Sequence, residues 1–163
     1  NYTPTLEKVY NIPNVFHIHG YIGDGNDEKL VFGHGMEVLE GEIPELDENG
    51  ESNRTPSYDA EAASHILFYQ FQKPVKNIID ENQSFFDSLK DVEKVVVLGH
   101  SLNDIDMLYI LKIKKCISKK SSWLIVYYDN KDKERAKDAM NIIGCDKKQY
   151  ELLTWDEYES IIN

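Results

Sequence analysis

Cysteine is scarce in this chain, and no pair of cysteines has the CxxC spacing of a metal or redox site. Only Cys116 and Cys145 occur among the 163 residues, and each lies in a helical apolar pattern. We therefore expect buried, reduced thiols, a state that suits a cytoplasmic protein. No apolar run approaches the roughly 18 residues that a membrane span needs, so no membrane contact is expected.

Basic residues are also in deficit. The 29 Asp and Glu outnumber the 18 Lys and Arg, which gives a formal net charge of −11. The negative electrostatic potential of such a chain repels a phosphate backbone, so nucleic acid is not expected as a partner. The lysines between residues 112 and 120 have helical spacing and are typical of a solvated helix face.

The length and the composition predict one α/β domain over residues 1–163, large enough to bury a core. The chain begins with Asn1 rather than Met, and its first apolar pattern follows almost at once, so we expect it to be part of a longer protein. Residues 40–57 are acidic and lack periodicity, which predicts a mobile loop.

Apolar runs rich in β-branched residues alternate with helical patterns along the chain. Strands are predicted at 14–20, 30–32, 94–99, 123–128 and 150–154. Helices are predicted from Tyr58 to the Lys73-Pro74 pair and over 75–89, 104–118, 131–143 and 156–162. This alternation, with short connections, predicts a parallel Rossmann-like sheet flanked by helices.

The stretch from Val95 to Asp106 is predicted to form a central strand, a turn and the start of a helix. An apolar strand ends abruptly in Gly-His-Ser, and a helical pattern then begins at Ile105. Ligands of open α/β sheets bind at the carboxyl ends of strands, where a helix start also offers free N–H groups. The candidate binding residues of this turn are Gly99, His100, Ser101, Asn103 and Asp104. The alternative is structural: Gly99 permits the turn, and Ser101 or Asn103 only caps the helix.

Histidines beside glycines form a second group of candidates. His19 lies at the end of the predicted strand 14–20, next to Gly20. It is therefore expected at the edge of the sheet where binding and catalytic residues lie in such folds. His34 stands between Gly33 and Gly35. Two glycines allow close backbone approach to a ligand, but they also serve to make a turn.

These residue types are shared by three kinds of site: a serine hydrolase, a metal centre and a nucleotide site. Residues 99–103 nearly match the G-x-S-x-G elbow of serine hydrolases, but Asn103 replaces the final glycine and no histidine follows His100. The histidines lack an H-E-x-x-H pattern, so structural histidines are favoured and no metal is expected. A nucleotide could be held by the Gly-His-Ser turn with His19 as a base, although no G-x-G-x-x-G is present.

Four blocks taken together resemble a known family: residues 16–20, 30–35, 85–89 and 97–106. They read Phe-His-Ile-His-Gly, Leu-Val-Phe-Gly-His-Gly, Phe-Phe-Asp-Ser-Leu and Val-Leu-Gly-His-Ser-Leu-Asn-Asp-Ile-Asp. In this order they look like the C-terminal portion of the AbiH phage abortive-infection family, within a sirtuin-like, Rossmann-type group. The resemblance covers roughly residues 10 to 130 and implies a partial sirtuin-like domain of bacterial phage defence.

The resemblance implies NAD as ligand or substrate, and an NAD glycohydrolase as the activity. His19 would act as the base on the nicotinamide ribose, and Gly99 and Ser101 would contact the ribose and phosphates. The other residues implied at the site are Gly20, His34, His100, Asn103 and Asp104. The alternative is a non-catalytic module that binds a nucleotide or a protein. A phage protein as trigger and an oligomer are further expectations.

The chain also departs from this pattern. Tyr10-Asn11-Ile12-Pro13 stands near the place where deacylating sirtuins carry Gln-Asn-x-Asp, and the four-cysteine zinc module is absent. Both departures argue against protein deacetylation. A phosphate loop like Gly-Asn-Gly-Phe-Asp is also absent, so part of any NAD site is expected to come from elsewhere.

Overall fold

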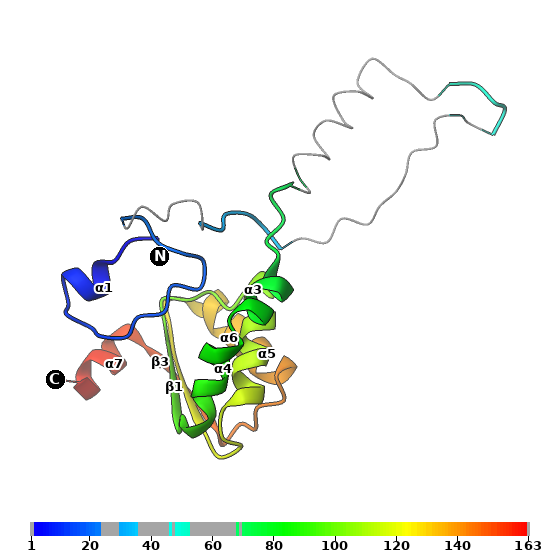
Figure 1. The fold of residues 1–163 in the computed structure, drawn as a ribbon. Helices are drawn as coiled ribbons and strands as arrows, with labels where there is room; N and C mark the ends of the chain where they lie inside the picture. Colours follow the sequence, from blue (N-terminus) through cyan, green and yellow to red (C-terminus); the bar gives the residue numbers. More distant parts are fainter. Residues whose placement is uncertain are drawn as a thin grey trace. The chain divides into compact units, whose positions relative to one another are not determined.

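The computed structural model describes residues 2–23, 30–35, 46, 48–52, 68 and 70–162. The chain divides into two compact units, Asn1–Lys73 and Pro74–Asn163, and each is described by itself (Figure 1). Most of the predicted loop 40–57, and most of the helix predicted from Tyr58, lie outside the described residues. The single domain over 1–163 stays a prediction.

The second unit contains a three-stranded parallel sheet. Its strands are β1 (Lys94–Leu98), β2 (Ser122–Tyr127) and β3 (Tyr150–Thr154), in the order β1-β2-β3. Helices follow each strand: α5 (Met107–Cys116), α6 (Asn130–Ile142) and α7 (Trp155–Ile162). The prediction of a parallel Rossmann-like sheet flanked by helices is confirmed, and these three strands lie within a residue of their predicted bounds.

One face of the sheet carries the main core. Val97 of β1 pairs in register with Ile125 of β2, and Trp123 and Ile125 are each 1% exposed. These side chains belong to one buried cluster with residues of α5 and α6. The ribbon shows α5 and α6 on this side of the sheet and α7 on the other, where α7 contacts β2 and β3 (Figure 1).

The position of β1 differs from what its sequence predicts. Its valine run is typical of a strand buried on both faces, yet Val96 is 43% and Leu98 44% exposed. The strand buried on both faces is β2, where Leu124 and Val126 are also buried. The reason is the position of α7, which packs on this second face against β2 and β3, whereas β1 is the opposite edge strand of the sheet.

The helix predicted over 75–89 is broken. It consists of α3 (Val75–Glu81), α4 (Gln83–Asp87) and a 3-10 helix (Ser88–Asp91). Asn82 separates α3 from α4, with φ −112° and ψ 29°, and its side-chain amide donates to the Ile78 carbonyl at 2.7 Å. Asparagine side chains compete in this way with the backbone bonds of a helix.

The first unit is largely irregular where it is described. It contains the short helix α1 (Thr5–Lys8), and the strands predicted at 14–20 and 30–32 are wrong. Asn11 and Asn14 have positive φ values of 53° and 59°, which extended backbone does not allow. The Gly20 N–H then donates to the His17 carbonyl at 2.9 Å, so the chain turns where the apolar alternation suggested a strand.

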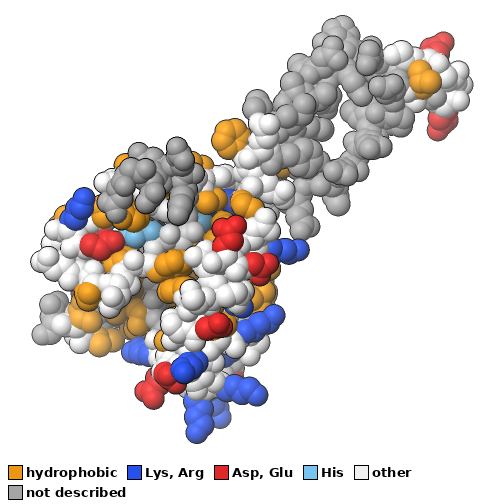
Figure 2. All heavy atoms as spheres, in the orientation of Figure 1, with side chains coloured by type: hydrophobic (Ala, Val, Ile, Leu, Met, Phe, Trp, Pro, Cys, Tyr) orange, Lys and Arg blue, Asp and Glu red, His pale blue; other side chains and the backbone are white. Residues whose placement is uncertain are grey.

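Basic side chains gather over one end of the second unit, around the loop between α5 and β2 (Figure 2). The lysines of the predicted solvated face are half-buried or exposed. No helix among the described residues has the length and apolar character to cross a membrane.

Candidate functional site

The turn that follows β1 has an unusual backbone. Gly99 has φ +62°, and Leu102, three residues later, has φ +49°. Leucine rarely adopts this left-handed conformation, which costs about 1–3 kcal/mol and is typical of functional sites. Leu102 is only 4% exposed and belongs to the main core cluster. Burial of its side chain therefore holds the strained turn in place.

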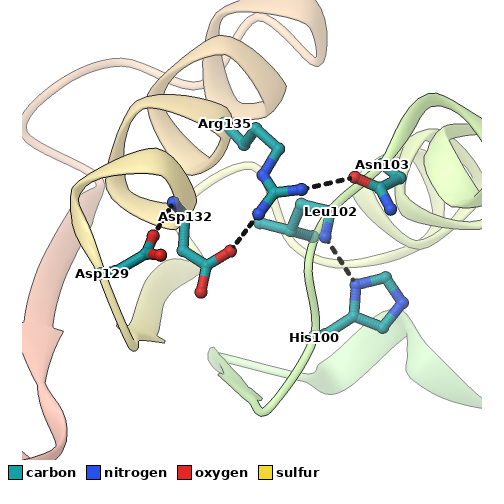
Figure 3. A network of polar contacts seen from close by, with 6 residues as sticks. All are labelled: His100, Leu102, Asn103, Asp129, Asp132 and Arg135. Atoms are coloured by element: carbon teal, nitrogen blue, oxygen red, sulfur yellow. Dashed lines mark hydrogen bonds and ion pairs between the residues drawn. The ribbon is translucent and has the colours of Figure 1, made fainter.

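The His100 ring folds back onto this turn (Figure 3). Its Nδ1 accepts a hydrogen bond from the Leu102 N–H at 3.0 Å, and its Nε2 lies 3.4 Å from Asp106 Oδ2. Because Nδ1 accepts, the neutral ring carries its proton on Nε2. His100 thus stabilises the backbone on which Ser101 is presented.

Of the two expected caps, Asn103 rather than Ser101 occupies the N-cap position. Asn103 precedes the 3-10 helix Asp104–Asp106 that leads into α5, but its side chain makes no cap bond. Asn103 Oδ1 instead accepts a hydrogen bond from Arg135 Nη1 at 3.2 Å. Ser101 is half-buried, and Asp104 is exposed. Among the described residues, no hydrogen bond joins Ser101 to a histidine. This part of the structure therefore shows no base that could activate Ser101 as in a serine hydrolase.

Arg135 is the residue that the sequence interpretation missed. It lies on α6, and its Nη2 pairs with Asp132 while Nη1 binds Asn103 (Figure 3). Asp129 caps α6 by accepting from the Asp132 N–H at 2.8 Å. A signal was available: β2 pairs with β1 in parallel, so the first turns of the helix after β2 lie at the same edge as Gly99.

His19 and Gly20 belong to the first unit. The His19 carbonyl accepts from the Val31 N–H at 3.0 Å, and the side chain is half-buried. Gly20 has φ +77°, a conformation that glycine adopts without strain. Three of the predicted site residues, His19, Gly20 and His34, thus lie in the first unit, and the five residues of the turn after β1 lie in the second.

His34 is held by a neighbouring segment. Its Nε2 donates to the Phe68 carbonyl at 3.0 Å, and the two rings lie 3.9 Å apart. Its backbone N–H donates to the Phe71 carbonyl at 2.9 Å. Gly33, with φ +135°, makes this approach feasible, because a Cβ there would lie 1.9 Å from the Phe71 oxygen. The close backbone approach permitted by Gly33 is thus made by Phe71.

His17 has a structural partner. Its Nε2 lies 2.6 Å from Glu7 Oε1, and this hydrogen bond lowers the pKa of the Glu7 carboxyl. The described part of the chain contains no group of three or more His, Cys, Asp or Glu residues that could hold a metal ion.

A separate hollow of about 360 Å³ lies between α6 and β3. It is lined by Lys137, Asn141, Lys147, Tyr150 and Leu152, and none of the predicted site residues lines it.

The second unit is therefore a Rossmann-like partial domain: a parallel sheet flanked by helices, with a strained turn at the carboxyl end of β1. The family model of bacteriophage abortive infection AbiH matches residues 1–128, and the chain belongs to this family. Comparison with curated proteins and with solved structures finds no match. The family match ends just after β2, so α6 and its Arg135 lie beyond it.

Proposed function

We propose that this AbiH protein acts in phage abortive infection, in the cytoplasm, by binding and hydrolysing NAD at the turn after β1. The observation that carries the proposal is this turn, in which Gly99 and the buried Leu102 both adopt left-handed backbone conformations. Strain of this kind persists only where the surrounding structure enforces it, and it is typical of ligand sites. The carboxyl end of a parallel strand is also where such sheets bind nucleotides.

The space beside Gly99 supports this choice of site. A Cβ built on Gly99 meets no atom within 4 Å among the described residues, whereas one on Gly33 would collide with Phe71. Gly33 therefore permits a contact within the protein, whereas the exposed Gly99, like Gly23, Gly50 and Gly144, has an open side that a ligand could approach. Gly99 and Ser101 would contact the ribose and phosphates, and Asn103 and Asp104 would complete the shell around them.

His19, in the first unit, is the residue that the family resemblance implies as the base for the chemical step of this activity. Its neutral imidazole would take a proton from a ribose hydroxyl as the bond between the ribose and nicotinamide breaks. Nicotinamide leaves in that step, water then adds to the same ribose carbon and loses a proton to solvent, and His19 returns its proton to the ribose oxygen, which gives ADP-ribose. Within the first unit, Gly20 would allow close backbone approach beside His19, with His34 as a further contact, and within the second unit His100 would be a further contact at the turn after β1. A sirtuin-like origin, a place in the C-terminal part of a longer protein, a phage protein as trigger and an oligomeric form belong to the same proposal.

The experiment measures nicotinamide release and NAD binding by residues 1–163 and by the protein with any upstream segment restored. We expect His19→Ala to abolish release and Ser101→Ala to weaken binding. Ser118→Ala is the matched control, because the Ser118 hydroxyl accepts from the Lys120 N–H in the loop before β2. Binding without release, unchanged in His19→Ala, would instead support a non-catalytic nucleotide-binding module. Absence of both in every form, also with phage lysate, would overturn the proposal.

A further inference from the structure

Arg135 lies at the carboxyl edge of the sheet, outside the residues that the family model matches. It is the one arginine within the described ranges, in a chain whose formal net charge is −11. Its side chain is 45% exposed and is directed at the turn after β1 (Figure 3). A fixed cation therefore faces the position where the proposed function places a nucleotide.

The guanidinium retains donors for a ligand. Arginine carries five N–H donors in a planar fork, and its contacts in the described structure are those to Asn103 and Asp132. Three nearby acids have partners, whereas Asp104, beside Asn103, is exposed. Asp132 pairs with Arg135, Asp129 caps α6, and Asp106 lies beside His100. These contacts reduce the repulsion that an anionic ligand would meet at this edge.

Other cations of α6 have different partners. Lys133 Nζ lies 5.1 Å from the centre of the Tyr127 ring, and Lys137 Nζ donates to Glu134 at 2.6 Å. Arg135 alone among these three reaches the turn, through the 3.2 Å bond to Asn103. Bidentate recognition of phosphate is also a property of arginine that lysine does not share.

We propose that Arg135 binds a phosphate group of the ligand at this edge and that its bond to Asn103 holds the turn ready for that ligand. The identity of the ligand as a nucleotide rests on the proposed function, whereas the anion contact itself does not. The residue thus selects phosphate-bearing ligands over the corresponding nucleosides.

The first test compares NAD with adenosine, by calorimetric titration of residues 1–163. We expect Arg135→Ala to weaken NAD binding by about tenfold or more, the equivalent of about 1.4 kcal/mol, with little change for adenosine. Arg135→Lys should restore only part of the loss. Lys131→Ala changes the net charge equally and comes from an exposed position on the same helix, so it should bind NAD like the wild type. Equal losses for NAD and adenosine, or equal losses in Lys131→Ala, would overturn the inference.

The second test uses inorganic pyrophosphate and the NMR signal of the Arg135 Nε–H, so it needs no nucleotide binding. We expect pyrophosphate to shift this signal and the amide signals of Ser101 and Asn103, and Arg135→Ala to remove the amide shifts. Shifts without any binding of NAD would support the anion contact and count against the proposed function. Binding of NAD with no pyrophosphate effect would uphold the proposed function and overturn the inference.

Discussion

Gly33 and Phe71 are packed so closely that a methyl group on Gly33 would lie 1.9 Å from the Phe71 carbonyl oxygen. The backbone bonds from the His34 N–H to the Phe71 carbonyl and from the Lys73 N–H to the His34 carbonyl depend on this contact. They join residues 33–34 to residues 71–73 within the first unit.

Gly33→Ala is therefore expected to destabilise the first unit, by about 3 kcal/mol or more because overpacking and strain combine. Gly23→Ala is the matched control, since Gly23 has φ +136° but nothing within 4 Å of a built Cβ. Amide exchange of His34 and Lys73 measures the effect. Similar exchange in the two variants would show that the contact with Phe71 is unimportant.

Gly99→Ala is expected to affect ligand binding more than stability. Gly99 has φ +62° and Gly144 has φ +64°, and neither has an atom within 4 Å of a built Cβ. Both substitutions should cost about 1–2 kcal/mol in backbone strain, measured by urea unfolding. Only Gly99→Ala should weaken NAD binding, because its methyl group would occupy the proposed ligand approach. Equal binding by both variants would count against a ligand beside Gly99.

Ser121→Ala is expected to lower the free energy of unfolding by about 1–3 kcal/mol, because a buried acceptor loses its donor. Ser121 is fully buried, and its hydroxyl donates to the Val92 carbonyl at 2.5 Å, just before β1. Ser88→Ala removes a comparable bond at an exposed position, to the Phe85 carbonyl at 2.6 Å, and serves as the control. Urea unfolding of both variants measures the difference, and equal losses would contradict the role of burial.

The two cysteines are expected to react at different rates. Burial raises the pKa of the Cys145 thiol, although the nearby Lys114 ammonium, 3.9 Å away, opposes the shift. A raised pKa leaves less thiolate at any pH below it, and Cys145 is also only 6% exposed. Iodoacetamide at pH 8, followed by mass spectrometry, should modify the half-buried Cys116 first. Faster modification of Cys145 would contradict this prediction.

The stability of the first unit is expected to depend on pH through Glu7. The hydrogen bond with His17 lowers the carboxyl pKa from its ordinary value of 4.5. A lowered pKa in the folded state gives a contribution that is present above pH 4.5 and is lost as the pH falls through the folded-state pKa. Glu7→Gln should flatten this part of the profile, as followed by amide exchange between pH 6 and 3. An unchanged profile would show that Glu7 contributes little.

Local sequence pattern predicted the second unit well and the described part of the first unit poorly. Strands β1, β2 and β3 are apolar runs that end at turn residues, so periodicity located them. The run Val-Phe-His-Ile-His of residues 15–19 has the same alternation, yet no strand forms there. A strand needs a partner, and the positive φ values of Asn11 and Asn14 are not visible in an apolar pattern.

The sequence by itself determined the parallel α/β order of the second unit, the turn at Gly99 and the membership of the AbiH family. Only the tertiary structure placed β2 at the centre of the sheet, because strand order depends on packing between distant segments. It also brought Arg135 into hydrogen-bond contact with Asn103, 32 residues away in the chain, and packed Gly33 against the backbone of Phe71. These contacts join residues that no local pattern relates, so only the folded chain reveals them.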